Sequence, residues 1–141
     1  MTESFNKGIY IPKNPEKYIG KNKIIFRSGW EYDFMKYLDI QANIKAWGSE
    51  CVVIPYSFCG KNHRYFTDFL VVTNEDKKIV IEIKPLRQTK LPRKSKNKSD
   101  RTLLYEQFTY MRNQAKWQAA IEYCKKRGWE FKILTEKELL I

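Results

Sequence analysis

The sequence predicts a single α/β domain in which helices flank a mixed central sheet. The expected segments follow the order helix, about three strands, long helix and strand, as in an α/β sandwich. The chain of 141 residues is 43% hydrophobic and 15% aromatic, which is enough for one substantial core. No internal repeat is evident, so we expect residues 1–141 to form one domain.

Composition also limits the function. With 27 Lys and Arg residues against 16 Asp and Glu, the net charge of +11 indicates a polyanionic partner, nucleic acid first and an acidic membrane surface second. No apolar run reaches the ~18 residues of a membrane span, and no signal peptide is evident. Three cysteines without a CxxC pair favour a reducing, intracellular setting. A single histidine argues against a zinc site, and the lack of a GxxxxGK(S/T) loop argues against a nucleotide cofactor.

The first 26 residues are polar and basic and contain Pro12 and Pro15, so we expect an extended basic arm over 1–26. This arm spells GIY at 8–10 and YIG at 18–20, the paired tripeptides of the GIY-YIG nucleases. Only seven residues separate the two tripeptides, and the prolines would remove donors from the required strand hairpin. A GIY-YIG nuclease is therefore kept as an alternative.

A helix is expected to begin after Ser28, because Ser28 and Glu31 form a capping box. Trp30, Phe34 and Leu38 follow helical spacing and predict a core stripe. The capping role alone is sufficient to explain a glutamate at position 31. A second interpretation is that its carboxylate also leans toward the acids on the sheet as a further metal ligand.

The segment from 65 to 84 predicts two strands joined by a polar turn at 74–76. Asp68, Glu82 and Lys84 then share one face, with isoleucines toward the interior on the other. If the turn has three residues, Asp68 faces Glu82 with Cβ atoms about 4.5–5.5 Å apart. A two-residue turn would put the acids on opposite faces.

Two adjacent carboxylates repel unless a cation lies between them. A nuclease needs such a pair to hold Mg²⁺, which activates water, and a cation such as Lys84 to neutralise developing charge. The alternative is a hairpin whose charged residues simply cover a solvated face.

The remaining segments have weaker signals. Residues 44–58 predict a strand pair or a bent strand, and 59–62 a turn. Glu50 is a candidate to support the acids or an ordinary surface charge. Residues 129–134 predict a strand, and 135–138 begin a short capped helix.

A long helix is expected over 102–127, ended by Gly128. Two apolar stripes run along it. The first comprises Leu104, Phe108, Met111 and Ala115, and the second comprises Trp117, Ala120, Ile121 and Cys124.

Residues 86–101 carry seven Lys and Arg against one acid, which predicts a mobile basic loop. It is either a solubilising loop or a phosphate clamp with salt-dependent binding, and we favour the clamp. Its candidate DNA-binding residues are Arg87, Lys90, Arg93, Lys94, Lys96, Lys98 and Arg101.

The order of these motifs resembles the PD-(D/E)XK nuclease superfamily: a helix with Glu31, a strand with Thr67-Asp68-Phe69, a strand with Ile81–Lys84, then a helix. Thr67 stands where proline is usual before the aspartate. The resemblance implies a restriction-endonuclease-like core.

The chain more closely resembles the head-completion nucleases of T-even-type tailed phages, and over its core it is similar to TnsA-type transposon-end endonucleases. The GIY and YIG letters fall within the head-completion pattern and are then accidental. The stretches that carry this resemblance are 12–15, 17–18, 27–31, 65–69, Asn113, 116–117, 119–120 and 135–136.

The resemblance implies roles for individual residues. Asp68 and Glu82 would be metal ligands, with Lys84 as the catalytic lysine. Glu31 would orient water or hold a second metal, and Asn113 and Lys116 would contact substrate phosphate. The implied cofactor is Mg²⁺, with Mn²⁺ able to substitute.

The implied function is a Mg²⁺-dependent DNA endonuclease that trims DNA protruding at the portal after packaging. Its partners would be DNA and the portal or another head protein, and its location the host cytoplasm during virion assembly or the virion itself. A non-catalytic DNA- or portal-binding factor and a transposon-like or repair nuclease are the alternatives. The complete set of Asp68, Glu82 and Lys84 argues against a non-catalytic factor.

Overall fold

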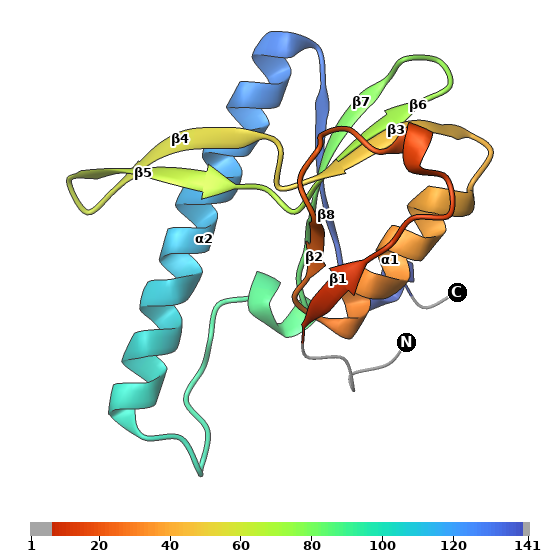
Figure 1. The fold of residues 1–141 in the computed structure, drawn as a ribbon. Coiled ribbons are helices and arrows are strands. Elements are labelled where there is room, and N and C mark those ends of the chain that lie inside the picture. The colour runs from red at the N-terminus through yellow and green to blue at the C-terminus, as the bar shows by residue number, and fades with distance from the viewer. Residues whose placement is uncertain (1–6, 140–141) are drawn as a thin grey trace.

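The computed structural model describes residues 7–139, and they confirm the mixed α/β architecture. A central sheet in the order β3-β6-β7-β8 lies between helix α1 and helix α2 (Figure 1). Three of its strands are antiparallel neighbours, whereas β8 runs parallel to β7, so the sheet is mixed. The bounds are α1 Gly29–Ile40, β3 Ile44–Ser49, β6 Phe69–Thr73, β7 Lys78–Ile83, α2 Asp100–Arg127 and β8 Glu130–Leu134.

Both faces of this sheet are buried, unlike the single interior face that the alternation predicted. Phe34 and Leu38 of α1 pack with Ile81 on one face. On the other face, Trp117 of α2 packs with Val80. The acidic face of β7 is therefore the α2 side of the sheet, and its charged residues are not a freely solvated strip.

The prediction of an extended N-terminal arm is wrong for its described part. β1 (Gly8–Tyr10) and β2 (Ile24–Phe26) form an antiparallel pair, and the 3-10 helix η1 (Pro15–Lys17) lies between them. Tyr10 and Phe26 are buried in the α1-side core. Pro15 sits in the first turn of η1, where no amide donor is needed. Residues 1–6 of the predicted arm lie outside the described residues.

This N-terminal segment is anchored by Asp39, which is fully buried near the end of α1. Its carboxylate accepts hydrogen bonds from the Tyr10 hydroxyl at 2.7 Å and from the Lys13 and Asn14 amides at 2.7 and 3.1 Å. The Lys17 ammonium donates to the last carbonyls of α1, including that of Leu38 at 2.8 Å. A cation at a helix C-terminus is favourable.

This arrangement of β1, η1 and β2 differs from the strand hairpin that a GIY-YIG nuclease requires. The GIY segment pairs with β2, and Tyr18 of the YIG segment forms a bridge with Trp47. The two tripeptides thus do not form a hairpin with each other. The Tyr10 hydroxyl is already engaged by Asp39.

Residues 44–66 form strands that belong to two different sheets. β3 joins the central sheet, whereas β4 (Val53–Phe58) and β5 (Lys61–Phe66) form a separate hairpin beside α2 (Figure 1). The chain passes back into the central sheet at Thr67, which is fully buried and bonds the Val52 carbonyl through both its amide and its hydroxyl. The stretch from 65 to 73 is therefore two strands with a crossing point just before Asp68.

α2 begins at Asp100, slightly earlier than predicted, because Ser99 caps it by accepting a hydrogen bond from the Thr102 amide. It ends as expected at Gly128, whose φ of 72° suits glycine. Of the first stripe, only Ala115 packs against the α2-side core, whereas most of the second stripe is buried there. Leu104, Phe108 and Met111 are exposed, whereas Trp117, Ala120 and Cys124 are buried. Ile121, expected with the second stripe, is 49% exposed.

The basic segment is partly ordered into secondary structure. It opens with the 3-10 helix η2 (Leu86–Thr89), and its last two residues belong to α2. Its mobility stays a prediction.

At the C-terminus, α3 (Glu136–Leu139) has the predicted cap, since the Glu138 carboxylate accepts a hydrogen bond from the Thr135 amide at 2.6 Å. Within residues 7–139, no helix is long and apolar enough to cross a membrane.

Candidate active site

The hairpin of β6 and β7 has the register that places the two acids opposite each other. Phe69 pairs with Ile81 and Leu70 with Val80, and the Thr73 amide bonds the Lys77 carbonyl around a three-residue turn. Asp68 immediately precedes β6 and continues this register toward Glu82. Its Oδ2 accepts a hydrogen bond from the Ile83 amide at 2.8 Å. The predicted three-residue turn is confirmed.

Asp68 and Glu82 form a crowded carboxylate pair, in which Glu82 is buried and Asp68 is half-buried. Glu82 is 5% exposed, and its Oε1 has no hydrogen-bond partner. Burial and the Asp68 carboxylate raise the pKa of Glu82 to about 8, while Lys84 opposes the rise. Burial also raises the pKa of Asp68, partly offset by the Ile83 amide and by Lys84. The Lys84 ammonium lies 3.8 Å from Glu82 Oε2, a long ion pair that offsets only part of the repulsion between the two carboxylates.

Glu31 caps α1 and also lies near the acids of the sheet. Its amide donates to Ser28 Oγ at 3.1 Å, as in a capping box, but its own Oε1 accepts the amide of Arg27 at 3.1 Å. Burial and the Asp68 charge raise the pKa of Glu31 to about 7. The carboxylate therefore stands within electrostatic reach of the pair on the sheet.

Glu31 does not complete a single cluster with Asp68 and Glu82. Among residues 7–139, no three His, Cys, Asp or Glu side chains are grouped so that they could hold one metal ion. The role predicted for Glu31, to orient water or to hold a second metal, stays a prediction. The Asp68–Glu82 pair remains the candidate ligand set, and Glu31 stands beside it.

α2 carries the two polar residues predicted to contact substrate phosphate, Asn113 and Lys116. Asn113 is buried. Lys116 is half-buried, and burial lowers its pKa although the Glu82 charge opposes the shift. The Lys116 ammonium also lies 5.5 Å from the centre of the Tyr65 ring. One cation from the long helix therefore faces the acids of the sheet.

Two neighbours of the acids were not predicted. Tyr65 of β5 is 3% exposed, and burial together with the Glu82 charge raises its pKa. Arg27 forms an ion pair of 2.9 Å with Glu50, whose amide in turn bonds the Asp68 carbonyl. Glu50 therefore supports the backbone at Asp68, in line with the supporting role considered for it.

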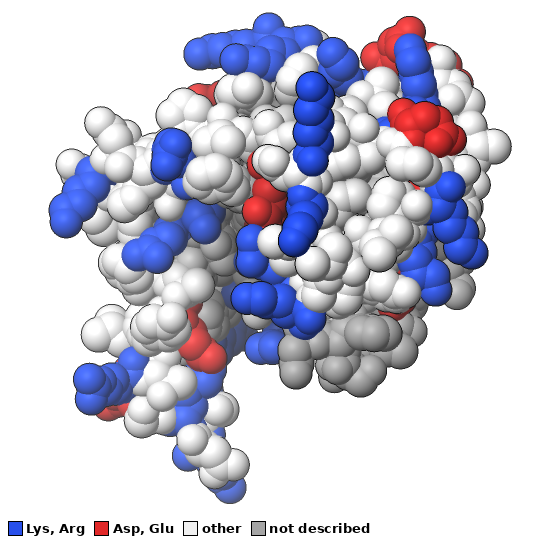
Figure 2. All heavy atoms as spheres, viewed as in Figure 1, with Lys and Arg blue, Asp and Glu red and all other residues white. Residues whose placement is uncertain are grey.

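The Lys and Arg side chains of the basic segment 86–101 lie in different surroundings. Arg87, Lys90 and Lys98 line a pocket of about 440 Å³ together with Asn113. Lys94 pairs instead with Asp100. The other predicted DNA-binding residues of this segment, Arg93, Lys96 and Arg101, are exposed. Figure 2 shows that Lys and Arg side chains border the hollow between α2 and the rest of the domain.

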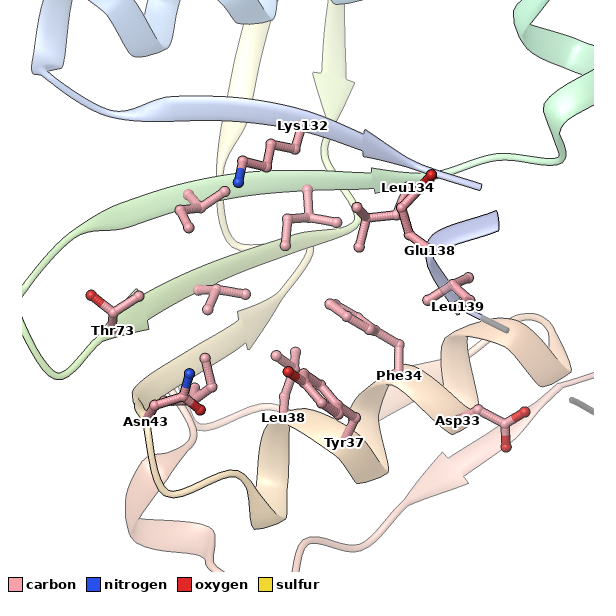
Figure 3. A pocket seen from close by; sticks show the side chains of 14 residues that line it. Asp33, Phe34, Tyr37, Leu38, Asn43, Thr73, Lys132, Leu134, Glu138 and Leu139 are labelled. Carbon is pink, nitrogen blue, oxygen red and sulfur yellow. The ribbon is translucent and has the colours of Figure 1, made fainter. Parts of the chain in front are cut away.

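A larger pocket of about 560 Å³ lies on the other face of the sheet. It is lined by Phe34 and Leu38 of α1, by Ile81 of β7 and by Leu134 of β8 (Figure 3). Ile81 is adjacent to Glu82 on the same strand and points to the opposite face. This mostly apolar pocket is therefore separate from the acidic pair.

Comparison with known proteins decides the family. Residues 41–136 match the family described as "TnsA-like endonuclease N terminal". The chain is also 42% identical over 139 residues to the head completion nuclease of Enterobacteria phage T4, and the match covers 94% of this chain and 92% of that protein.

The chain belongs to the TnsA-like endonuclease family. The span matched to these endonucleases contains Asp68, Glu82 and Lys84, and the match to the phage T4 nuclease covers most of the chain. The predicted resemblance, the fold class and the nuclease function are thereby confirmed. Membership in a family of TnsA-like endonucleases favours an enzyme over a non-catalytic binding factor.

Proposed function

We propose that this chain is a metal-dependent DNA endonuclease whose site consists of Asp68, Glu82 and Lys84, with Glu31 beside them. The observation that carries the proposal is the crowded carboxylate pair, in which Glu82 Oε1 lacks a partner and the pKa of Glu82 is raised to about 8. Two crowded carboxylates with an unused oxygen are suited to a divalent cation, and oxygen ligands are those that Mg²⁺ prefers.

The residues present fit Mg²⁺, with Mn²⁺ as a substitute. Asp68 and Glu82 would hold the ion. When bound, such an ion lowers the pKa of coordinated water and stabilises charge on the phosphoryl oxygens. The net charge of +11 suits DNA as the polyanionic substrate.

The chain's own residues supply the remaining steps. Glu31, with a pKa of about 7, is suited to accept a proton from the attacking water. The Lys84 ammonium neutralises charge on the phosphate, and Lys116 and Asn113 hold the backbone from the α2 side. In-line attack of water on phosphorus breaks the bond to the 3′ oxygen, which takes a proton from solvent. The products are a 5′-phosphate and a 3′-hydroxyl.

The biological role follows from the relative. The phage T4 protein is named a head completion nuclease, and the similarity along 94% of this chain supports the same stage of assembly here. We place its action in the cytoplasm of the infected host, on DNA that protrudes at the portal after packaging. Contact with the portal or another head protein belongs to this proposal.

The Lys84→Met variant tests the catalytic assignment. It removes the ammonium but keeps a side chain of similar length, so cleavage is expected to slow by at least about 100-fold. The rate is measured with end-labelled DNA in Mg²⁺, and the product ends are mapped in parallel. DNA affinity should change by less than about threefold, because one phosphate contact among many is lost.

Lys132→Met is the matched control, because Lys132 lies on β8 and lines the pocket on the other face of the sheet. It should cut at the wild-type rate. A Lys84→Met variant that cuts as fast as this control would remove Lys84 from the site.

A further inference from the structure

Of the residues that line the basic pocket of about 440 Å³, the proposed chemistry uses only Asn113. It lies between η2, the basic segment that follows it, and the N-terminal half of α2. Two features connect it to the site along the chain: η2 begins two residues after Lys84, and Asn113, which lines the pocket, lies one turn before Trp117 on α2. We therefore take a group held in this pocket to belong to the same DNA strand as the phosphate at the carboxylate pair.

The walls of the pocket are held by specific contacts. The Leu86 amide donates to Glu136 Oε1 at 2.6 Å, and Thr89 Oγ1 donates to the Leu86 carbonyl at 2.6 Å, which fixes η2. The Lys98 ammonium lies 2.7 Å from Glu106 Oε1, which ties the basic segment to α2. The pocket is thus bounded on both sides by secondary structure.

Its lining combines aromatic, amide and cationic groups with one carboxylate, Glu106, which pairs with Lys98. Tyr105 and Tyr110 of α2 supply aromatic rings, and Tyr105 is 72% exposed. Gln88 and Asn113 supply side-chain amides. The cations of the pocket are Arg87, Lys90 and Lys98.

This combination matches one unpaired nucleotide better than a duplex backbone. An unstacked base packs against an exposed aromatic ring, and amides can bond the edge of that base. Cations take the adjoining phosphates. In duplex DNA the bases are stacked on each other and only the backbone and groove edges are available, so an exposed tyrosine in a pocket would have no base face to contact.

We infer that this pocket holds an unpaired nucleotide beside the scissile phosphate, so that the preferred substrate is DNA with a single-stranded end or flap. The inference rests on the proposed DNA endonuclease function. Tyr105 acts as the stacking platform, and Arg87 and Lys90 hold the strand as it leaves the site.

The test measures binding, which needs no cleavage. A fluorescent oligothymidylate and a blunt duplex of equal length are titrated with the full chain in EDTA, and affinities are read by anisotropy. Tyr105→Ala is expected to weaken binding of the single strand by at least about fivefold, because one base stack is lost. Binding of the duplex should change by less than about twofold, because phosphate contacts remain.

Two variants control this result. Tyr105→Phe keeps the aromatic ring and should bind the single strand like the wild type. Leu104→Ala changes the neighbouring residue of α2, which is 69% exposed and is not part of the pocket lining. It should leave both affinities unchanged. Because both positions are exposed, the fold is expected to tolerate these substitutions.

Failure of this inference can be told from failure of the proposed function. Equal effects of Tyr105→Ala on both DNAs, or no effect on either, would overturn the nucleotide pocket even if the carboxylate site cuts DNA. If the wild type cuts no DNA but Tyr105→Ala weakens binding of the single strand alone, the nucleotide pocket is supported and the catalytic proposal is contradicted.

Discussion

Replacing Glu82 by glutamine is expected to abolish DNA cleavage while stabilising the metal-free protein. Glutamine keeps the shape of the side chain but removes the charge that a divalent cation needs, so the cleavage rate should fall by at least about 100-fold. The stability gain has a different origin. Glu82 is 5% exposed and beside Asp68, and its pKa is raised to about 8 in the folded protein.

The sign of the stability effect follows from that shift. A carboxyl whose pKa is raised by folding binds its proton more tightly in the folded state, so its ionisation destabilises the fold. This destabilisation begins as the pH rises above the ordinary glutamate value of 4.5 and is largest above about 8. At about pH 8 the variant should therefore be more stable than the wild type by on the order of 2 kcal/mol, and the difference should vanish near pH 4.

Urea unfolding of both proteins in EDTA at the two pH values measures this difference, and a cleavage assay at pH 8 gives the activity. Glu130→Gln on the neighbouring strand β8 is the control, because Glu130 forms an ion pair with Lys77 at 3.2 Å on the surface. That variant should keep full activity. A stable Glu82→Gln protein that still cuts would contradict the assignment of Glu82 as a ligand.

Replacing Asp39 by alanine is expected to give the largest loss of stability outside the site. Asp39 is fully buried, and the change leaves the Tyr10 hydroxyl and the Lys13 and Asn14 amides without their acceptor. The Tyr10 donor is buried and the two amides are partly buried, so leaving them unpaired should lower the free energy of unfolding by about 2–4 kcal/mol. Denaturant unfolding at neutral pH measures it.

The pH dependence provides an independent check. Burial by itself would raise the pKa of Asp39, but the hydrogen bonds from Tyr10, Lys13 and Asn14 lower it overall. The stabilisation by Asp39 is therefore fully present above the ordinary value of 3.8 and is lost as the pH falls through the lowered pKa. Asp33→Ala on the same helix, a half-exposed position, should change stability by less than about 0.5 kcal/mol. An Asp39→Ala protein as stable as that control would mean that the N-terminal segment is held by other contacts.

The carboxylate pair could be predicted because its geometry is local. A three-residue turn and the period of two fix which residues of a hairpin face each other, so Asp68 and Glu82 could be matched from the sequence alone. The cap at Ser28 and the helix end at Gly128 are also local signals.

The errors arose where distant contacts decide the structure. Nothing near Pro12 or Pro15 signals that Asp39, more than twenty residues later, supplies the acceptor that folds the N-terminal segment onto α1. On α2, periodicity alone cannot tell which stripe meets the sheet. The N-terminal half of α2, which carries Leu104 and Phe108, stands away from the sheet in Figure 1, and so both side chains stay exposed.

Tyr65 was missed for a related reason. Its place beside Glu82 depends on the crossing of the chain from the β4–β5 hairpin into the central sheet at Thr67. If residues 65–73 are assumed to form one unbroken strand, nothing in the sequence places Tyr65 beside Glu82.

The most direct test of the central claim is the nicking of supercoiled plasmid by four samples: wild type in Mg²⁺, wild type in EDTA, Asp68→Asn in Mg²⁺ and Tyr10→Phe in Mg²⁺. We expect nicking by the wild type in Mg²⁺ and by Tyr10→Phe, and none in EDTA or by Asp68→Asn. Nicking by Asp68→Asn, or its loss in a folded Tyr10→Phe protein, would contradict a metal-dependent site at the carboxylate pair.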